Sequence, residues 1–520
     1  MSASREKKNR QELAANGIPD PKKVREAEDR RAQRRANRLY GGIAAAFVVL
    51  AIGLILWNSN IFQRTATALT VDGVKYTAAE VDYYYYSTYS SLVNSSYASW
   101  MELSRSTDLN SNLNDMAKMI LQVEEDTTWD AYFKDSAKKN LIQLTKLKAA
   151  AKADGFAFTD EMQSDMDETL ASLNEYASEY GYSPEAYLKL IYGNNMTLSC
   201  FKKMLKDSLL VSHYQDDYAQ KLTYTDEELA DYYAEHSNDY DLAAYDYITF
   251  RGTASSTTDE DGNTVEPTEE ESAAALEAAK TAANEALERY RAGESLEEIA
   301  DDYEIASYSS LDAGSYSDSA LGNWVFDSAR KADDNAVVEG DSYYYVAVFH
   351  SRAREEYNTV DVRHILFTVD SSALDSESDT YEEELAKLDD AAKSKAEETL
   401  QQWKDGDATE ESFAALANEL SDDTGSNTNG GLYEQIYRNQ MVTEFNDWIF
   451  DESRQSGDTG IVYNSGAYTG YHIIYFVGEN DPYWMVQVRS DRKEADYTAW
   501  LDGLVENAVV TEGSGMEYVG

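Results

Sequence analysis

The sequence predicts an α+β multidomain protein with a single N-terminal transmembrane helix, an α-helical module and two tandem α+β domains. Three features predict this fold class. An uncharged apolar run follows a basic stretch, amphipathic helical patterns with few Gly or Pro interruptions come next, and two later stretches repeat one order of strands and helices. Because 520 residues exceed what one hydrophobic core supports, several domains are expected.

The first 57 residues predict a cytoplasmic tail and a membrane anchor. Residues 1–38 hold 12 of the 45 Lys and Arg residues but only 6 of the 96 acidic residues. Residues 39–57 (LYGGIAAAFVVLAIGLILW) are 19 uncharged residues, and a helix of this length, at about 1.5 Å per residue, roughly spans a bilayer core. Because arginines precede the run and neutral residues follow it, the positive-inside rule places the N-terminus in the cytoplasm and the rest outside the cell membrane.

Two alternatives remain open for this region. A cleaved signal peptide would also be basic and then apolar, but the basic stretch is unusually long and no small-x-small cleavage site follows the run. We therefore expect an uncleaved, single-pass anchor. The basic tail could contact nucleic acid or lipid headgroups, although a topology signal is the simpler interpretation.

Residues 66–243 are expected to form a helical, chaperone-like module. The segment opens with ATALTVDGVKYT, a short alternating pattern around an Asp-Gly turn, which predicts a hairpin. Thr77 followed by Glu80 then predicts the start of a helix. Apolar and charged positions at helical spacing continue to about residue 222.

Residues 244–356 and 357–480 look like two copies of one α+β unit. Each begins with a strand (YDYITF or VRHILF), passes through an acidic loop into an amphipathic helix, contains NWVFD or DWIFD, and ends on YYYVAVF or GYHIIYF. Repeats of this size indicate tandem domains rather than a solenoid. The remaining residues, 481–520, are expected to hold a strand at 484–488 and a helix at 491–508, and to pack on the helical module.

Charge and composition exclude several classes of function. The formal net charge is −51, and beyond residue 38 the chain carries 33 basic and 90 acidic groups (45 less 12, and 96 less 6). Such a surface repels phosphate backbones, so we expect no nucleic-acid partner. The one cysteine, Cys200, excludes an internal disulfide and a Cys-based zinc cluster, and no cofactor or metal is expected. The motifs Gly-x-Ser-x-Gly and His-Glu-x-x-His are missing, which argues against hydrolases of those types.

The second repeat resembles the parvulin family of peptidyl-prolyl isomerases over essentially its whole length. The motifs that carry the resemblance come in the family's order: RHILF, FAALANELSDD, NGGL, QMVTEF, DWIF and GYHII. The resemblance implies that His364 and His472 form a hydrogen-bonded pair, with Asp423 at a Cys-or-Asp position beside them and Thr469 at a hydroxyl position. It also implies a proline-binding slot made by Leu432, Met441, Phe445 and Phe450.

These residue types suit the rotation of an X-Pro bond. Rotation faces a barrier of about 20 kcal/mol because amide resonance is lost at the twisted state. No covalent bond breaks, so a catalyst needs an apolar slot for the proline ring and a polar wall that favours the twisted amide. The histidines are expected to act by shape and hydrogen bonding rather than by proton transfer. As alternatives, Asp423 could only cap its loop, and the apolar residues could be ordinary core residues.

The first repeat departs from the family pattern where the chemistry is expected. Aligned on its strands and on the WVFD motif, it has Tyr247 and Tyr345 at the histidine positions. Ser317 and Leu321 occupy the positions of the methionine and the first phenylalanine, while Phe326 keeps its counterpart. We expect this degenerate copy to be catalytically silent and to serve as a scaffold or a peptide-binding surface.

The order of the domains resembles the SurA-like and PrsA-like extracytoplasmic foldases. The resemblance rests on the opening TVDGVKYTAAEVD, the parvulin units and the returning C-terminal helix, and it departs from those families in its anchor. It implies that residues 66–243, with 481–520, form a chaperone cradle for unfolded or proline-containing secreted or surface polypeptides. The predicted function is therefore a membrane-anchored isomerase and chaperone. A non-catalytic holdase and an envelope structural protein are the alternatives, and no oligomeric state is predicted.

Overall fold

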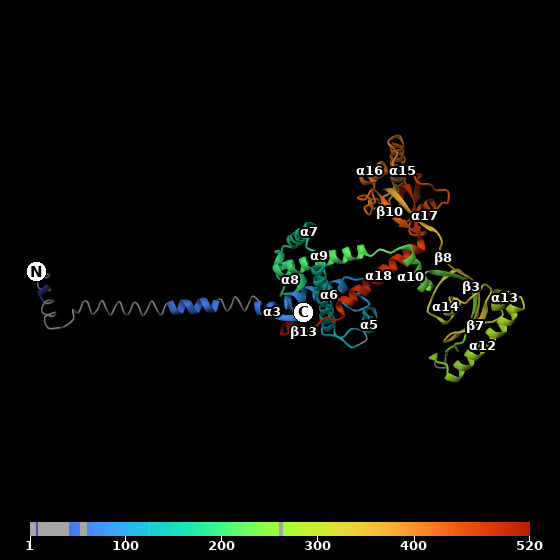
Figure 1. The fold of residues 1–520 in the computed structure, drawn as a ribbon, viewed down its shortest axis with the longest axis horizontal. Helices are drawn as coiled ribbons and strands as arrows, with labels where there is room; N and C mark the ends of the chain where they lie inside the picture. The colour runs from blue at the N-terminus through green and yellow to red at the C-terminus, as the bar shows by residue number, and fades with distance from the viewer. Residues whose placement is uncertain (1–6, 9–40, 52–59, 124, 259–263) are drawn as a thin grey trace. The chain divides into compact units, whose positions relative to one another are not determined.

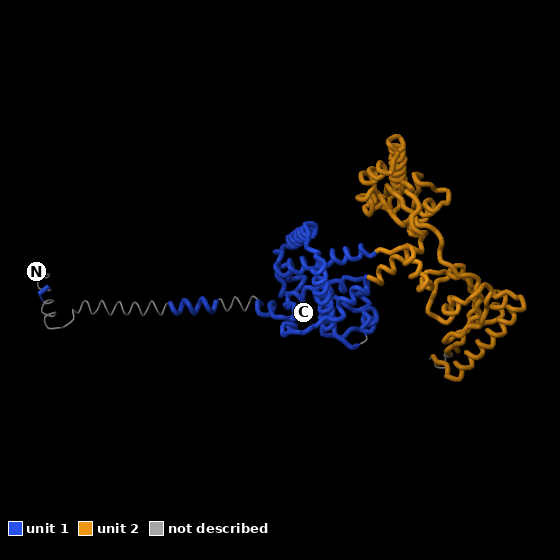
Figure 2. Tube along the Cα trace, viewed as in Figure 1, with its two compact units in different colours: residues 1–222, 497–520 blue, residues 223–496 orange. Residues whose placement is uncertain are grey.

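The computed structural model describes residues 7–8, 41–51, 60–123, 125–258 and 264–520 (Figure 1). The chain divides into two compact units. One comprises residues 1–222 and 497–520, and the other comprises residues 223–496 (Figure 2).

The expected membrane anchor lies partly outside the described residues. Residues 41–51 are helical and exposed, whereas residues 39–40 and 52–57 of the expected span fall outside the described ranges. Within those ranges, no helix is both long enough and apolar enough to cross a membrane. The expected basic tail is described only at residues 7–8.

Helices dominate the first unit. Its elements are α3 (Ile61–Thr65), β1 (Thr67–Val71), β2 (Val74–Thr77), α4 (Ala78–Val93), α5 (Asp115–Leu121), α6 (Trp129–Ala153), α7 (Asp160–Glu179), α8 (Pro184–Tyr192), α9 (Leu198–Lys221), β13 (Val510–Glu512) and the 3-10 helix η1 (Ser514–Tyr518). Strand β1 lies between β13 and β2 in a small antiparallel sheet.

Local sequence explains how this unit begins. Asp72 and Gly73 adopt positive φ angles of 48° and 82°, which lets β1 and β2 meet in a tight hairpin. Thr77 and Glu80 form a capping box at the first turn of α4, as their spacing predicts. Helices α4, α6 and α9 then bury their apolar faces in one core, whose largest fully buried side chains include Trp129, Phe133, Leu141 and Leu144.

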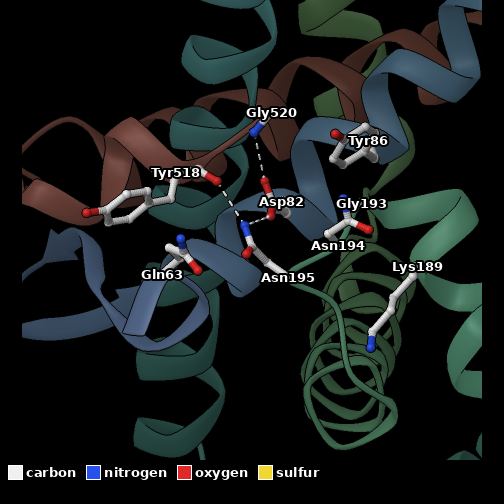
Figure 3. A pocket seen from close by; sticks show the side chains of 9 residues that line it. All are labelled: Gln63, Asp82, Tyr86, Lys189, Gly193, Asn194, Asn195, Tyr518 and Gly520. Carbon is white, nitrogen blue, oxygen red and sulfur yellow. Dashed lines mark hydrogen bonds between the residues drawn. The ribbon is translucent and has the colours of Figure 1, made fainter. Parts of the chain in front are cut away.

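The C-terminal residues join the first unit through a buried carboxylate. Asp82 on α4 is only 1% exposed and accepts hydrogen bonds from the Nδ2 atom of Asn195 (2.8 Å) and from the backbone N–H of Gly520 (3.0 Å; Figure 3). The same amide group of Asn195 donates to the carbonyl oxygen of Tyr518 at 2.8 Å. Burial raises the pKa of Asp82 to about 6.

The second unit contains two four-stranded antiparallel sheets with equivalent strand orders, β6-β3-β8-β7 and β10-β9-β12-β11. Its elements are α10 (Asp226–Glu235), α11 (Ser237–Tyr240), β3 (Asp241–Arg251), β4 (Thr257–Thr258), β5 (Thr264–Val265), α12 (Glu269–Arg291), α13 (Leu296–Asp301), β6 (Ala306–Ser315), α14 (Ala320–Val325), β7 (Asn335–Glu339), β8 (Tyr343–Arg354), β9 (Asn358–Thr368), α15 (Tyr381–Asp405), α16 (Glu410–Leu420), β10 (Leu432–Ile436), α17 (Thr443–Ile449), β11 (Thr459–Asn464), β12 (Gly470–Pro482) and α18 (Tyr483–Val505). Helix α18 continues into the first unit.

Helix α18 corrects one sequence-based prediction. The strand expected at residues 484–488 is wrong, because these residues form the first turns of α18. Trp484 and Val488 are buried together with Leu229 of α10, and their i, i+4 spacing places them on one helix face. A short apolar run is compatible with either a strand or a buried helix, so the residues that pack against it decide which of the two forms. By its contacts, the segment 223–243 belongs to the second unit.

Apolar side chains cover both faces of the second sheet. On one face, Ile365 and Ile473 pack in a core with residues of α15 and α16. On the other face, Val362 and Ile474 pack in a core with residues of α17. His364 and His472 are each two residues from one of these side chains on the same strand, so they lie on this second face as well. The candidate site is therefore on the face that α17 covers.

Candidate active site

Two histidines meet on the face of the second sheet that α17 covers. In the antiparallel pair β9 and β12, His364 lies opposite Ile474 and His472 lies opposite Leu366, so the two imidazoles are diagonal neighbours on one face. The Nε2 atom of His364 lies 2.9 Å from the Nδ1 atom of His472, and the rings stack with centroids 5.0 Å apart. Both side chains are buried.

A carboxylate completes this polar group. The Oδ2 atom of Asp423, in the loop between α16 and β10, lies 3.4 Å from the Nδ1 atom of His364. The same oxygen accepts hydrogen bonds from the hydroxyls of Ser426 (2.5 Å) and Tyr433 (2.8 Å). The contact with His364, together with these donors, holds the pKa of Asp423 well below its usual range, so the carboxylate is ionised at neutral pH.

The partners of the two imidazoles indicate where the ring hydrogens lie. The Nε2 atom of His472 is 3.2 Å from the carbonyl oxygen of Tyr468, which can only accept, so this nitrogen carries a hydrogen. Burial, with His364 nearby, lowers the pKa of His472 to about 4, so His472 is neutral and its Nδ1 atom accepts from His364. The other nitrogen of His364 faces Asp423 and is placed to donate to it. The arrangement is an ionised Asp423 in contact with His364, which is hydrogen-bonded to a neutral His472.

An apolar cluster lies against the imidazoles. Phe445 on α17 is buried, and its ring meets the rings of His364 and His472 edge-on, with centroids 5.3 Å and 6.0 Å away. Met441 and Phe450 pack in the same cluster and are partly buried. An apolar cluster that contains a methionine and two phenylalanines, and that contacts the polar pair through Phe445, can hold a proline ring while its amide faces polar groups.

The strand β10 brings Tyr433, rather than Leu432, into this cluster. Tyr433 lies opposite Val362 on β9, and Val362 shares a sheet face with His364. Leu432 lies opposite Arg363 and does not belong to the cluster. Sequence reasoning missed Tyr433, because alternation places Leu432 and Tyr433 on opposite faces but only the register of β10 against β9 decides which of them faces the histidines.

Thr469 contacts its own loop. Its hydroxyl donates to the carbonyl oxygen of Gly466 at 2.6 Å rather than to either imidazole. Its backbone carbonyl accepts from the N–H of Val369 at 2.9 Å, which ties the loop before β12 to the end of β9. In this structure, Thr469 therefore supports the loop that carries Tyr468, the backbone partner of His472.

Two glycines let the loop with Asp423 reach the histidine strand. Gly430 and Gly431 have φ angles of 66° and 68°, a region that side chains disfavour. A Cβ atom on Gly431 would lie 2.2 Å from the backbone oxygen of His364, and the N–H of His364 donates to the Gly431 carbonyl at 2.8 Å. The NGG sequence thus fixes the loop against β9 at the histidine itself.

The first sheet repeats this diagonal strand register with tyrosines in place of the histidines. Tyr247 lies opposite Ala347 on β8, and Tyr345 is two residues from Ala347, the same diagonal as the histidine pair. The two tyrosine rings meet with centroids 6.1 Å apart. Only residues 302–305 connect α13 to β6, so the loop that carries Asp423 in the second copy has no equivalent here. Leu321 is buried in this cluster, whereas Ser317 is exposed.

In the part of the chain that the structure describes, no group of three or more His, Cys, Asp and Glu side chains is arranged to hold a metal ion. The His364 and His472 nitrogens that face each other are occupied by their mutual hydrogen bond.

A comparison with protein families matches residues 343–479 to the PPIC-type PPIASE domain. This range contains every predicted site residue and begins at β8, the last strand of the first repeat. No curated protein matches the chain.

Solved structures of foldases are similar to the chain at low identity. PrsA from Bacillus subtilis is 14% identical, with 74% of this chain and 88% of that chain covered and a TM-score of 0.29. The foldase protein PrsA from Streptococcus pneumoniae is 12% identical, with coverages of 76% and 95% and a TM-score of 0.23. A SurA-like chaperone from Campylobacter jejuni is 11% identical, with coverages of 66% and 96% and a TM-score of 0.16. The family match identifies residues 343–479 as a PPIC-type PPIASE domain.

Proposed function

We propose that this chain, which contains a parvulin-type peptidyl-prolyl isomerase domain, is a membrane-anchored foldase that isomerises X-Pro bonds in unfolded secreted or surface proteins. One observation carries the proposal. The buried pair of His364 and His472 is in contact both with the ionised Asp423 and with the ring of Phe445. A proline ring and its amide require this juxtaposition of a polar wall with an apolar slot.

The proposed mechanism needs no covalent step. The proline ring is held by Met441, Phe445 and Phe450, while the chain before the proline rotates. Twisting removes the amide resonance, so the transition state differs from both planar isomers mainly in its charge distribution. The imidazoles are already fixed by hydrogen bonds to one another, to Asp423 and to backbone, so they need no reorganisation when the amide twists.

An aromatic groove in the first unit supports a chaperone role. A cavity of about 710 Å³ is lined mainly by tyrosines and aliphatic side chains: Tyr86, Tyr89, Val93, Tyr180, Tyr182, Tyr187, Leu190 and Ile191. Tyr180 and Leu190 are 64% and 67% exposed. Tyrosine supplies apolar area with a polar tip, which suits contact with varied unfolded segments. This groove also favours the second candidate function, a holdase whose isomerase domain only binds peptide.

The proposed location is the outer side of a cell membrane, with the N-terminus in the cytoplasm. The support is the uncharged run at 39–57 and the arginines that precede it. The test adds protease to intact cells that express the chain with a tag at each end. We expect the tag at residue 1 to be protected and the tag at the C-terminus to be cleaved. Accessibility of both tags would contradict the proposed topology.

The isomerase function is tested with the full chain in detergent micelles and a proline-containing tetrapeptide. We expect catalysis above the uncatalysed rate, and Met441→Ala and His472→Ala should each lower kcat/KM about tenfold, as the loss of one well-packed contact does. Tyr345→Ala, at the matching position of the first sheet, should leave the rate unchanged. A wild-type rate equal to the uncatalysed rate would leave the holdase as the better description.

The chaperone function is tested separately, by aggregation of a chemically unfolded client. The full chain should suppress aggregation to the same extent when His472→Ala has lowered its isomerase activity. Replacement of Tyr180 and Tyr182 by serine should weaken the suppression without changing kcat/KM. Wild-type protein that leaves aggregation unchanged would remove the chaperone role and leave the isomerase intact.

A further inference from the structure

We infer that Tyr433 is a positioning residue of the isomerase site, because its hydroxyl fixes the carboxylate of Asp423 against His364 while its ring forms one side of the proline slot. The inference rests on the proposed isomerase function. It assigns a role to a residue that the resemblance to the parvulin family does not include among the expected site residues.

The ring of Tyr433 lies among the residues proposed to form the slot. Its strand partner is Val362, and alternation places it on the face that carries His364. The centroids of the Tyr433 and His364 rings are 6.3 Å apart, with an angle of 47° between the ring planes. Tyr433 packs in the same apolar cluster as Met441 and Phe445.

The hydroxyl of Tyr433 acts as a donor at neutral pH. It donates to the Oδ2 atom of Asp423 at 2.8 Å. Burial, reinforced by the adjacent carboxylate of Asp423, raises the pKa of Tyr433 to about 12, so the hydroxyl keeps its hydrogen. The bond to an ionised acceptor is of the stronger, charge-assisted kind.

The other contacts of Asp423 show why this bond matters. Ser426 and the N–H of Gly425 also donate to the carboxylate, but both belong to the same loop as Asp423. Tyr433 on β10 and His364 on β9 are the partners that tie this carboxylate to the sheet. Because the carboxylate lies 3.4 Å from the Nδ1 atom of His364, a small rotation of its side chain would open this contact.

A second tyrosine–carboxylate hydrogen bond in the same domain, outside the site, provides a matched control for the Tyr433 variant. The hydroxyl of Tyr471 donates to the Oδ2 atom of Asp389 at 3.0 Å. Tyr471 precedes His472 on β12 but packs on the opposite face of the sheet, in the core with α15 and α16. Tyr433→Phe and Tyr471→Phe therefore each delete one tyrosine–carboxylate hydrogen bond in one domain, and only the first bond lies in the site.

The experiment compares these two variants in the full chain, with the tetrapeptide assay. Tyr433→Phe keeps the ring, so we expect KM within about twofold of wild type and kcat reduced about fivefold to tenfold. Tyr471→Phe should leave both unchanged. Nitrogen NMR of the histidine rings, assigned with His364→Gln, should show altered ring-nitrogen signals of His364 in Tyr433→Phe and unaltered signals in Tyr471→Phe.

A double-variant cycle decides whether Tyr433 acts through Asp423. If it does, Tyr433→Phe should have almost no further effect in the Asp423→Asn background. Additive losses, or a Tyr433→Phe variant with wild-type kcat beside an impaired Asp423→Asn, would overturn the inference while the isomerase stands. A wild-type protein without catalysis would instead remove the proposed function itself.

Discussion

The Nε2 atom of His364 lies 2.9 Å from the Nδ1 atom of His472, although 108 positions separate the two residues in the sequence. Two antiparallel strands bring them together as diagonal neighbours, and each ring has a different polar group beside it. His364 faces an ionised carboxylate, whereas His472 faces a backbone carbonyl. The pair is thus asymmetric, and this asymmetry gives the site a predictable response to pH.

The first prediction concerns the pH dependence of activity. Because burial lowers the pKa of His472 to about 4, its neutral form persists through the physiological range, and kcat/KM should be constant between about pH 5 and 8. Activity should fall as the pH drops through about 4, when His472 gains a proton and can no longer accept from His364. A pH titration of kcat/KM checks this, and a decline centred near pH 6.5 would contradict it.

The same shift predicts how the domain's stability depends on pH. The folded-state pKa of His472 lies below its unfolded value, so the unfolded state binds more protons at intermediate pH. The free energy of unfolding should be highest above about pH 6.5 and should decrease as the pH falls toward 4. Hydrogen exchange of β12 at several pH values measures this, with His472→Gln as the variant in which this contribution should vanish.

The second prediction concerns Gly431. An alanine there would bring a Cβ atom to 2.2 Å from the backbone oxygen of His364 and would also be strained at a φ of 68°. We expect Gly431→Ala to cost about 3 kcal/mol or more and to abolish most activity. Gly457→Ala is the control, because its φ is 94° but the nearest atom to its added Cβ, the Tyr475 hydroxyl oxygen, is 3.9 Å away. The control should cost only about 1 kcal/mol and retain activity.

The third prediction concerns a pair of arginine–tryptophan contacts that occurs in both repeats. The Nε atom of Arg454 donates to the carbonyl oxygen of Trp448 at 2.9 Å, and its guanidinium lies 4.0 Å from the centre of the Trp448 ring. Arg330 makes the same two contacts with Trp324, at 3.0 Å and 4.0 Å. Each arginine to alanine change should destabilise its own repeat by about 1–2 kcal/mol.

Hydrogen–deuterium exchange with mass spectrometry separates the two effects. Arg454→Ala should raise exchange at residues 443–464 and leave residues 320–339 unchanged, while Arg330→Ala should do the reverse. Equal effects of either variant on both segments would contradict an independent role for each pair.

The fourth prediction concerns the attachment of the C-terminal residues by Asp82. Its folded-state pKa of about 6 is above the ordinary value of 3.8, so its contribution to stability is fully present below about pH 3.8 and is lost as the pH rises through 6. Protection factors of residues 510–520 should therefore be lower at pH 7.5 than at pH 5. Asp82→Asn, which cannot ionise, should remove this difference, and an unchanged pH response in that variant would exclude Asp82 as its source.

The sequence by itself determined the local features of this protein. Thr77 and Glu80 specify a helix start through their own hydrogen bonds, and Asp72 with Gly73 specifies a tight turn, because such signals depend on neighbouring residues only. The motifs of the second repeat also predicted an isomerase domain, which the family match confirms.

Only the tertiary structure decided which side chains share a surface. The choice between Leu432 and Tyr433 depends on the register of β10 against β9, and a shift of one residue exchanges the two faces of a strand. The helical state of residues 484–488 depends on Leu229, more than 250 positions earlier, which covers one side of α18. Register and long-range packing are set by contacts between distant segments, so no local pattern contains them.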